Sequence, residues 1–73
     1  MSPHHKALEK AIEIAGSQAE LGRRSNRSQQ IIHYYLNGAK RIPLDAALAF
    51  SRAVDGAVKP SDFIPELDES SAA

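Results

Sequence analysis

The sequence predicts an all-α fold, a compact bundle of about five short helices. Apolar residues recur at intervals of three and four, as at Leu8, Ala11, Ile12 and Ala15, which is the spacing of one buried helical face. Glycine, serine and proline divide the chain into short segments at points where helices are expected to begin and end. No stretch of useful length alternates between apolar and polar residues as a strand would.

Size and composition limit the class of protein. The 73 residues suffice for one small domain, which we assign to residues 1–67. The acidic tail, residues 68–73, is expected to be disordered. The absence of cysteine excludes disulfides and thiolate metal sites. With no apolar run long enough to span a membrane and no signal peptide, the chain is expected to be a soluble cytoplasmic protein without a membrane partner.

The first two helices are separated by a glycine and a serine. Gly16 ends the first helix, because glycine tolerates the left-handed conformation found just beyond a helix. Ser17 is a suitable N-cap for the second helix, and Glu20 three residues later completes the pattern of a capping box. This second helix is predicted over Gln18–Arg24, with Leu21 buried.

A polar break, residues 25–27, precedes the third helix, and Asn26 suits a left-handed turn. Ser28 is the N-cap of this helix, which lasts to residue 36 or 37 and stops at Gly38. On a helical wheel the side chains separate into two halves. The apolar half comprises Ile31, Ile32, Tyr35 and Leu36, and the polar half comprises Gln29, Gln30, His33, Tyr34 and Asn37.

The last two helices are bounded by prolines. Pro43 suits the first turn of a fourth helix, which reaches about Val54 and stops at Gly56. A short fifth helix starts near Pro60 and is broken by Pro65. Phe63 and Ile64 are expected to close the small core, and the inner stripe of the fourth helix is predicted to be Leu44, Ala47, Leu48, Ser51 and Val54.

Charge is distributed unevenly in this neutral chain. Residues 17–41 hold five basic residues and one acidic residue, a net charge of +4, whereas residues 42–73 hold two basic and six acidic residues, a net charge of −4. A neutral protein can therefore present one basic face, which favours an anionic partner, although solvated surface charge gives the same count.

The outer half of the third helix indicates what that partner is. It is polar without a formal charge, whereas an ordinary exposed helix carries lysine and glutamate. Glutamine amides match the N6 and N7 edge of adenine, and the first turn of a helix can enter the major groove. Gly22 would let two helices cross closely before that turn. The alternative interpretation is that Gly22 is a weak point and Gln29 and Gln30 an idle polar pair.

At these residues the segment QAELGRRSNRSQQIIHYYLNG resembles the helix-turn-helix of lambdoid phage repressors and Cro proteins. It is especially similar to the short YdaS-type regulators, and the similarity runs from Leu8 to Leu67. The resemblance implies a lambda-repressor-like domain in which Gln18 touches a phosphate and steadies the first glutamine of the recognition helix. Expected base contacts are Ser28, Gln29, Gln30, His33 and Tyr34, and expected phosphate contacts are Gln18, Arg23, Arg27, Asn37, Lys40 and Arg41.

Two positions depart from the family in a way that affects the turn. Ser25 and Arg27 stand where the family has apolar residues, so the turn is expected to be less well buried, with Arg27 pointing to a phosphate. Gly22 stands where the family usually has alanine, and Asn26 where it has glycine; both are compatible substitutions.

The sequence thus predicts a DNA-binding transcriptional regulator, a Cro-like repressor that binds a palindromic operator in double-stranded DNA. We expect no cofactor and a weak homodimer strengthened on DNA, formed through the fourth and fifth helices with Phe50 on their exposed side. The alternative is a DNA-binding antitoxin whose toxin partner would contact the acidic tail and the apolar residues Phe50, Phe63 and Ile64.

Catalysis and metal binding are not expected. His33 and Ser28 are five residues apart, so they do not share a helix face as a nucleophile and its base would. His4, His5 and His33 lack the spacing of metal ligands. The two adjacent histidines near the terminus are predicted to be surface residues.

Overall fold

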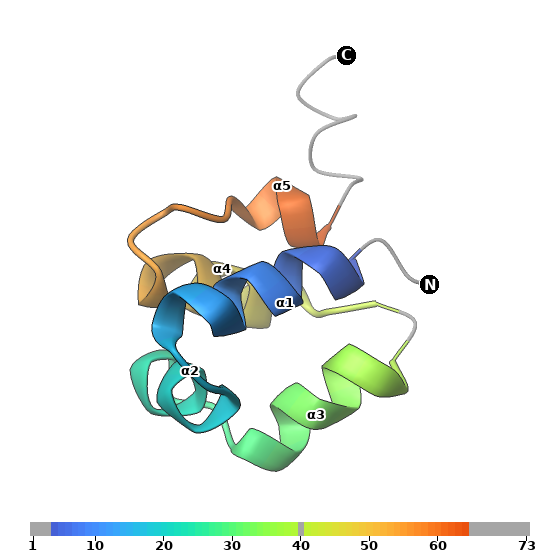
Figure 1. Ribbon diagram of the computed structural model, residues 1–73. Coiled ribbons are helices and arrows are strands. Elements are labelled where there is room, and N and C mark those ends of the chain that lie inside the picture. Colours follow the sequence, from blue (N-terminus) through green and yellow to red (C-terminus); the bar gives the residue numbers. More distant parts are fainter. Residues whose placement is uncertain (1–3, 40, 65–73) are drawn as a thin grey trace.

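The computed structural model describes residues 4–39 and 41–64 of the chain (Figure 1). These residues form α1 (His4–Ala15), α2 (Gln18–Ser25), α3 (Gln29–Asn37), α4 (Leu44–Ala53) and α5 (Pro60–Phe63). The described part contains helices and connecting turns but no strand, so the predicted all-α bundle of five helices is confirmed. The predicted disordered tail, residues 68–73, lies outside the described residues.

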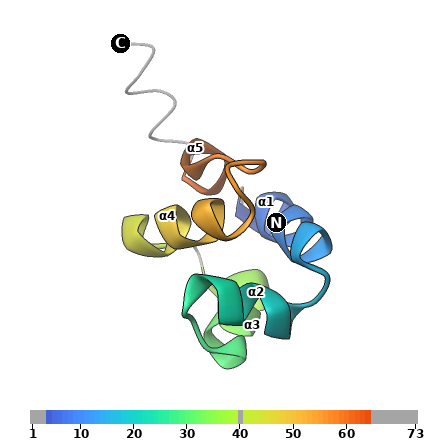
Figure 2. The ribbon, with the colours of Figure 1, turned by 90° about the vertical axis from the view of Figure 1, so that its left-hand side faces the viewer.

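The helices are arranged in three levels. In Figures 1 and 2, α5 lies at one end of the molecule, α1 and α4 lie side by side in the middle, and α2 and α3 form the other end. Contacts between helices agree with this order, since α2 packs on α1, α3 and α4, while α5 packs on α1 and α4. The end formed by α2 and α3 is therefore remote from α5. No helix in the described part of the chain is long and apolar enough to cross a membrane.

The core is mostly aliphatic and is centred on two phenylalanines. Phe50 and Phe63 are buried, with ring centroids 5.8 Å apart, and Tyr35 packs edge-on against Phe50 at 6.2 Å. Ile64 is partly buried beside them, so the prediction that Phe63 and Ile64 close the core is confirmed. Other buried members are Leu8, Ala11, Ala15, Leu21, Ile32, Ile42, Ala46, Ala47, Val54 and Val58.

The predicted inner stripe of α4 is partly wrong. Leu44 and Leu48 are 50% and 38% exposed, whereas Phe50 is completely buried. A helix cannot turn all three side chains inward, and an aromatic ring removes more apolar surface from water than a leucine does. The helix is therefore rotated to bury Phe50, and Phe50 is not available on the exposed side of α4 as a dimer contact.

Candidate nucleic-acid interface

A three-residue turn joins α2 to α3. Asn26 adopts the left-handed conformation, with φ 57° and ψ 41°, as predicted. The backbone amides of Asn26 and Arg27 both donate to the carbonyl oxygen of Gly22, the latter at 2.9 Å. Ser28 then begins α3, and its hydroxyl accepts a hydrogen bond from the amide of Ile31 at 3.1 Å. The turn is thus closed by hydrogen bonds at both of its ends.

Gly22 is required at the crossing of α2 with this turn. A Cβ atom on Gly22 would lie 2.6 Å from the carbonyl oxygen of Arg27 and 3.4 Å from Cδ1 of Ile32. The first distance is a clash with backbone, which moves less easily than the end of a side chain. The interpretation of Gly22 as a merely weak point of α2 is therefore wrong, because its missing side chain sets how closely α3 approaches α2.

Gly22→Ala tests this close approach. At an open helix position the change would stabilise the domain by about 1 kcal/mol, because alanine is the better helix former. Here the added methyl group is expected to destabilise it instead, by roughly 1–3 kcal/mol as in other overpacked sites. Urea unfolding followed by circular dichroism measures the difference, with Ala19→Gly on the exposed side of α2 as the control for helix propensity. A stabilised Gly22→Ala variant would contradict the crossing geometry.

The turn is better buried than predicted. Ser25 is only 5% exposed, and its hydroxyl donates to the carbonyl oxygen of Leu21 at 2.7 Å. A serine that bonds back to the preceding helical turn satisfies its own polar group and can be buried among apolar residues. The expectation that Ser25 would loosen the turn is therefore wrong.

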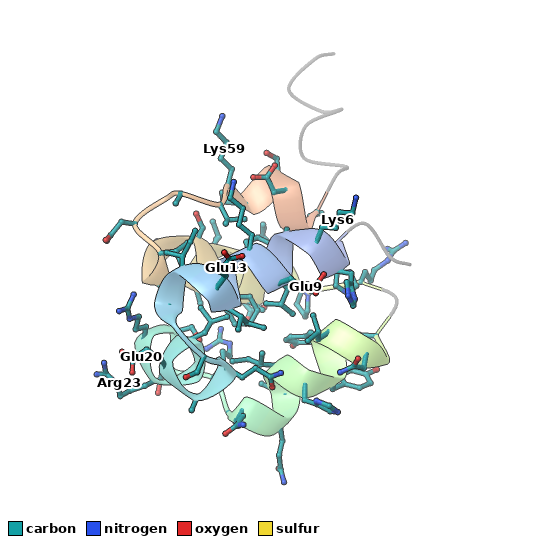
Figure 3. All side chains as sticks on the ribbon, viewed as in Figure 1. Lys6, Glu9, Glu13, Glu20, Arg23 and Lys59 are labelled. Carbon is teal, nitrogen blue, oxygen red and sulfur yellow. The ribbon has the colours of Figure 1, made fainter. Side chains whose placement is uncertain are left out.

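The arginines around the turn have partners within the protein. The guanidinium of Arg27 is 3.2 Å from Oδ2 of Asp45 at the start of α4. Arg23 and Arg24 both donate to the carboxylate of Glu20, and Figure 3 shows Glu20 and Arg23 together at the outer edge of α2. Hydrogen bonds from Arg23 and then Arg24 lower the pKa of Glu20. The carboxylate therefore does not complete the predicted capping box, although Ser17 caps the helix by accepting from the amide of residue 20.

Arg41 differs from these arginines. It is exposed, and it has no part in the ion pairs found among residues 4–39 and 41–64. It follows α3 in the chain, which is a position where a phosphate contact was predicted. The other basic residue predicted there, Lys40, lies outside the described residues.

The outward side of α3 is a continuous polar surface. The predicted base-contacting residues are all exposed, while Ile32 is buried and the other apolar residues of the helix pack against the core. Asn37 is exposed as well, and its amide donates to the carbonyl oxygen of His33 at 3.2 Å. The predicted division of the helix into an inner and an outer half is confirmed. The exposed set comprises Ser28, Gln29, Gln30, His33 and Tyr34.

Gln18 lies beside this surface although it belongs to α2. Together with Gln29, Gln30 and His33 it lines a surface hollow of about 320 Å³. The close crossing at Gly22 brings the start of α2 next to the start of α3, so three amide side chains and an imidazole meet in one place. These groups offer hydrogen-bond donors and acceptors without a fixed charge, a set suited to reading the edges of bases.

Comparison with known proteins gives one match. Residues 8–72 match the family model described as "Bacterial toxin YdaS". Neither a curated protein nor a solved structure matches the chain significantly. The match covers nearly the whole chain, including the turn and the polar surface of α3.

Proposed function

The chain belongs to the family described as bacterial toxin YdaS, a family of small helical proteins, and we propose that it is a sequence-specific DNA-binding transcriptional regulator. The observation that carries the proposal is the uncharged, amide-rich outer side of α3, exposed at one end of the molecule and held against α2 by the crossing at Gly22. In this function α3 enters the major groove, and the protein acts as a Cro-like repressor at a palindromic operator.

The chemistry of the first turn of α3 supports this function. Gln29 and Gln30 follow the Ser28 cap directly and are exposed. A glutamine amide can donate to N7 and accept from N6 of one adenine, which no lysine or glutamate side chain does. The positive end of the helix dipole lies at the same turn and favours the nearby phosphates. Base reading and phosphate attraction would therefore act at one end of α3.

A palindromic operator requires two copies of the chain, and we propose a weak homodimer that becomes stable on DNA. Because Phe50 is buried, the surface proposed for this contact is the exposed side of α4, with Leu44 and Leu48 at its centre. Asp45 and Arg52 are exposed on the same helix. Opposite charges on one face allow an antiparallel pair of α4 helices to face each other with unlike charges across the two-fold axis.

Selection of bound sites from random double-stranded DNA tests the proposal. We expect a two-fold symmetric consensus with adenines in each half-site, where the glutamines would bind. Half-sites about 10 base pairs apart would fit a symmetric pair of α3 helices. A failure to enrich any sequence, at a salt concentration that suppresses non-specific binding and with DNA in excess over protein, would reject sequence-specific recognition by this chain.

Arg41→Ala tests the role proposed for the exposed arginine after α3. Loss of one phosphate contact is expected to weaken binding to every sequence alike and to reduce the salt slope, d log K/d log [salt], by about 0.9. Fluorescence anisotropy over a salt series measures both quantities. Lys59→Ala is the matched control, because Lys59 lies beside α5 at the end of the molecule remote from α2 and α3 (Figure 3). Equal slopes for wild type and Arg41→Ala would show that Arg41 faces away from DNA.

The family description supports a second candidate, a component of a toxin–antitoxin pair. The apolar part of the surface predicted for a toxin partner is not exposed, since Phe50 and Phe63 are buried, and its acidic tail lies outside the described residues. The exposed Leu44 and Leu48 would offer a partner apolar side chains instead. Controlled expression in a bacterial host separates the candidates. Growth arrest that persists when Gln29 and Gln30 are both alanine favours a toxin over a regulator that acts through DNA.

A further inference from the structure

The C-terminal end of α3 is capped by side chains from α1. The last carbonyl groups of a helix have no partners within it and must be satisfied from elsewhere. The carbonyl oxygen of Tyr34 accepts from the amides of Gly38 and Ala39 at 2.8 and 2.9 Å. The next two carbonyls, of Tyr35 and Leu36, receive hydrogen bonds from the first turn of α1.

Two adjacent histidines supply these hydrogen bonds. Nε2 of His4 lies 2.7 Å from the carbonyl oxygen of Tyr35, and Nδ1 of His5 lies 2.9 Å from that of Leu36. A carbonyl oxygen only accepts, so the hydrogen must be on Nε2 in His4 and on Nδ1 in His5. His4 is 1% exposed and His5 is half-buried, so the prediction that both are surface residues is wrong.

α3 does not end in a left-handed glycine, the usual conformation that satisfies the last carbonyl groups of a helix. The helix stops at Gly38 as predicted, but Gly38 has φ −129° and is not in the left-handed conformation. Glu9, one turn along α1 from His5, lies 3.2 Å from Nε2 of that ring, where Nε2 donates when the ring is protonated. His5 thus lies between a carboxylate of its own helix and a carbonyl of α3. These contacts join residues 31 apart in the chain.

We propose that His4 and His5 are positioning residues for DNA recognition, which tie the last turn of α3 to α1. The outward residues His33, Tyr34 and Asn37 belong to the same part of α3 as the two capped carbonyls. If these hydrogen bonds are lost, the last turn frays and the outward side chains lose their fixed place relative to Gln29 and Gln30. The inference rests on the proposed function for its effect on DNA, but the hydrogen bonds themselves can be tested without DNA.

Exchanging the donor atom separates positioning from general packing. An asparagine amide nitrogen stands where Nδ1 of histidine does, and a glutamine amide nitrogen stands near the place of Nε2. His5→Asn is therefore expected to keep the bond to Leu36 and the operator affinity. His5→Gln and His5→Ala are expected to lose roughly 2- to 12-fold in operator affinity, the equivalent of one hydrogen bond, with the salt slope unchanged. At His4 the donor is Nε2, so the order of the variants is reversed. His4→Gln is expected to keep the bond to Tyr35 and the operator affinity, and His4→Asn is expected to lose them.

The readout without DNA is nuclear magnetic resonance. Ring nitrogen shifts should show the Nε2–H form for His4 and a hydrogen on Nδ1 for His5, with exposed His33 as the internal reference. Amide exchange at Gly38 and Ala39 should accelerate in His5→Gln and not in His5→Asn.

Equal amide exchange in these two variants would overturn the hydrogen bonds that cap α3. Faster exchange in His5→Gln with undiminished operator affinity overturns the positioning role and leaves a structural one. If wild type binds no operator, the proposed function and the positioning role both fail, while the exchange data still decide whether the caps exist.

Discussion

Phe50→Ala is expected to leave the domain largely unfolded or on the edge of unfolding. Phe50 is completely buried between the rings of Tyr35 and Phe63. Replacing a buried phenylalanine with alanine costs about 3–5 kcal/mol. A chain of 73 residues is expected to have a free energy of unfolding of only about 4–11 kcal/mol, so this one substitution removes much or all of it.

Urea unfolding followed by circular dichroism at 222 nm, a wavelength that reports helix content, is the measurement for this variant. Leu48→Ala is the matched control, because Leu48 is apolar and belongs to the same helix but is 38% exposed. We expect the control to lose well under half of what Phe50→Ala loses. A larger loss for Leu48→Ala than for Phe50→Ala would mean that α4 buries the leucine face instead.

The error over α4 shows where helical periodicity stops being decisive. Leu44, Leu48 and Phe50 are all apolar, and the spacing of the sequence allows α4 to bury either the leucines or the phenylalanine. The phenylalanine is buried because its ring packs against Tyr35 on one side and Phe63 on the other, and both of these residues belong to other helices. A pattern within one helix cannot contain that information.

Helix starts were predictable because capping is local chemistry. Ser17 and Ser28 each accept a hydrogen bond from an amide three residues later, and Asn26 takes the left-handed turn that its type tolerates. The partner of Arg27 was not predictable, because Asp45 lies 18 residues away and meets it only once α4 has packed on α2. Local signals therefore give the turn, and tertiary packing gives the partners of its charges.

The burial of His4 in α1 could have been predicted from the sequence. His4 precedes Leu8 by four residues and so continues the buried stripe of Leu8, Ala11 and Ala15. A polar residue in line with an apolar stripe is buried only when its hydrogen bonds are satisfied, so this position predicts a partner on another helix. What the sequence could not name was the carbonyl of Tyr35, because backbone acceptors are not visible in the pattern of side chains.

The largest expected effect on DNA recognition comes from Gln29→Ala and Gln30→Ala. Both side chains are exposed at the first turn of α3, and neither packs in the core. Alanine is the best helix former, so the fold and the Ser28 cap should be unaffected. One bidentate pairing with adenine discriminates against the wrong base by roughly 1–3 kcal/mol. Each variant is therefore expected to lose preference at one or two symmetric operator positions, and only there.

Competition between the selected operator and its single-base variants, at one salt concentration, measures that preference position by position. Arg41→Ala provides the opposite pattern, because a lost phosphate contact weakens every sequence alike and leaves preferences unchanged. If a glutamine variant behaves like Arg41→Ala, that glutamine binds the backbone of the DNA rather than a base. If both glutamine variants keep the wild-type preference at every position, α3 does not read the groove through its first turn. The hollow shared by Gln18, Gln29, Gln30 and His33 would then need another ligand.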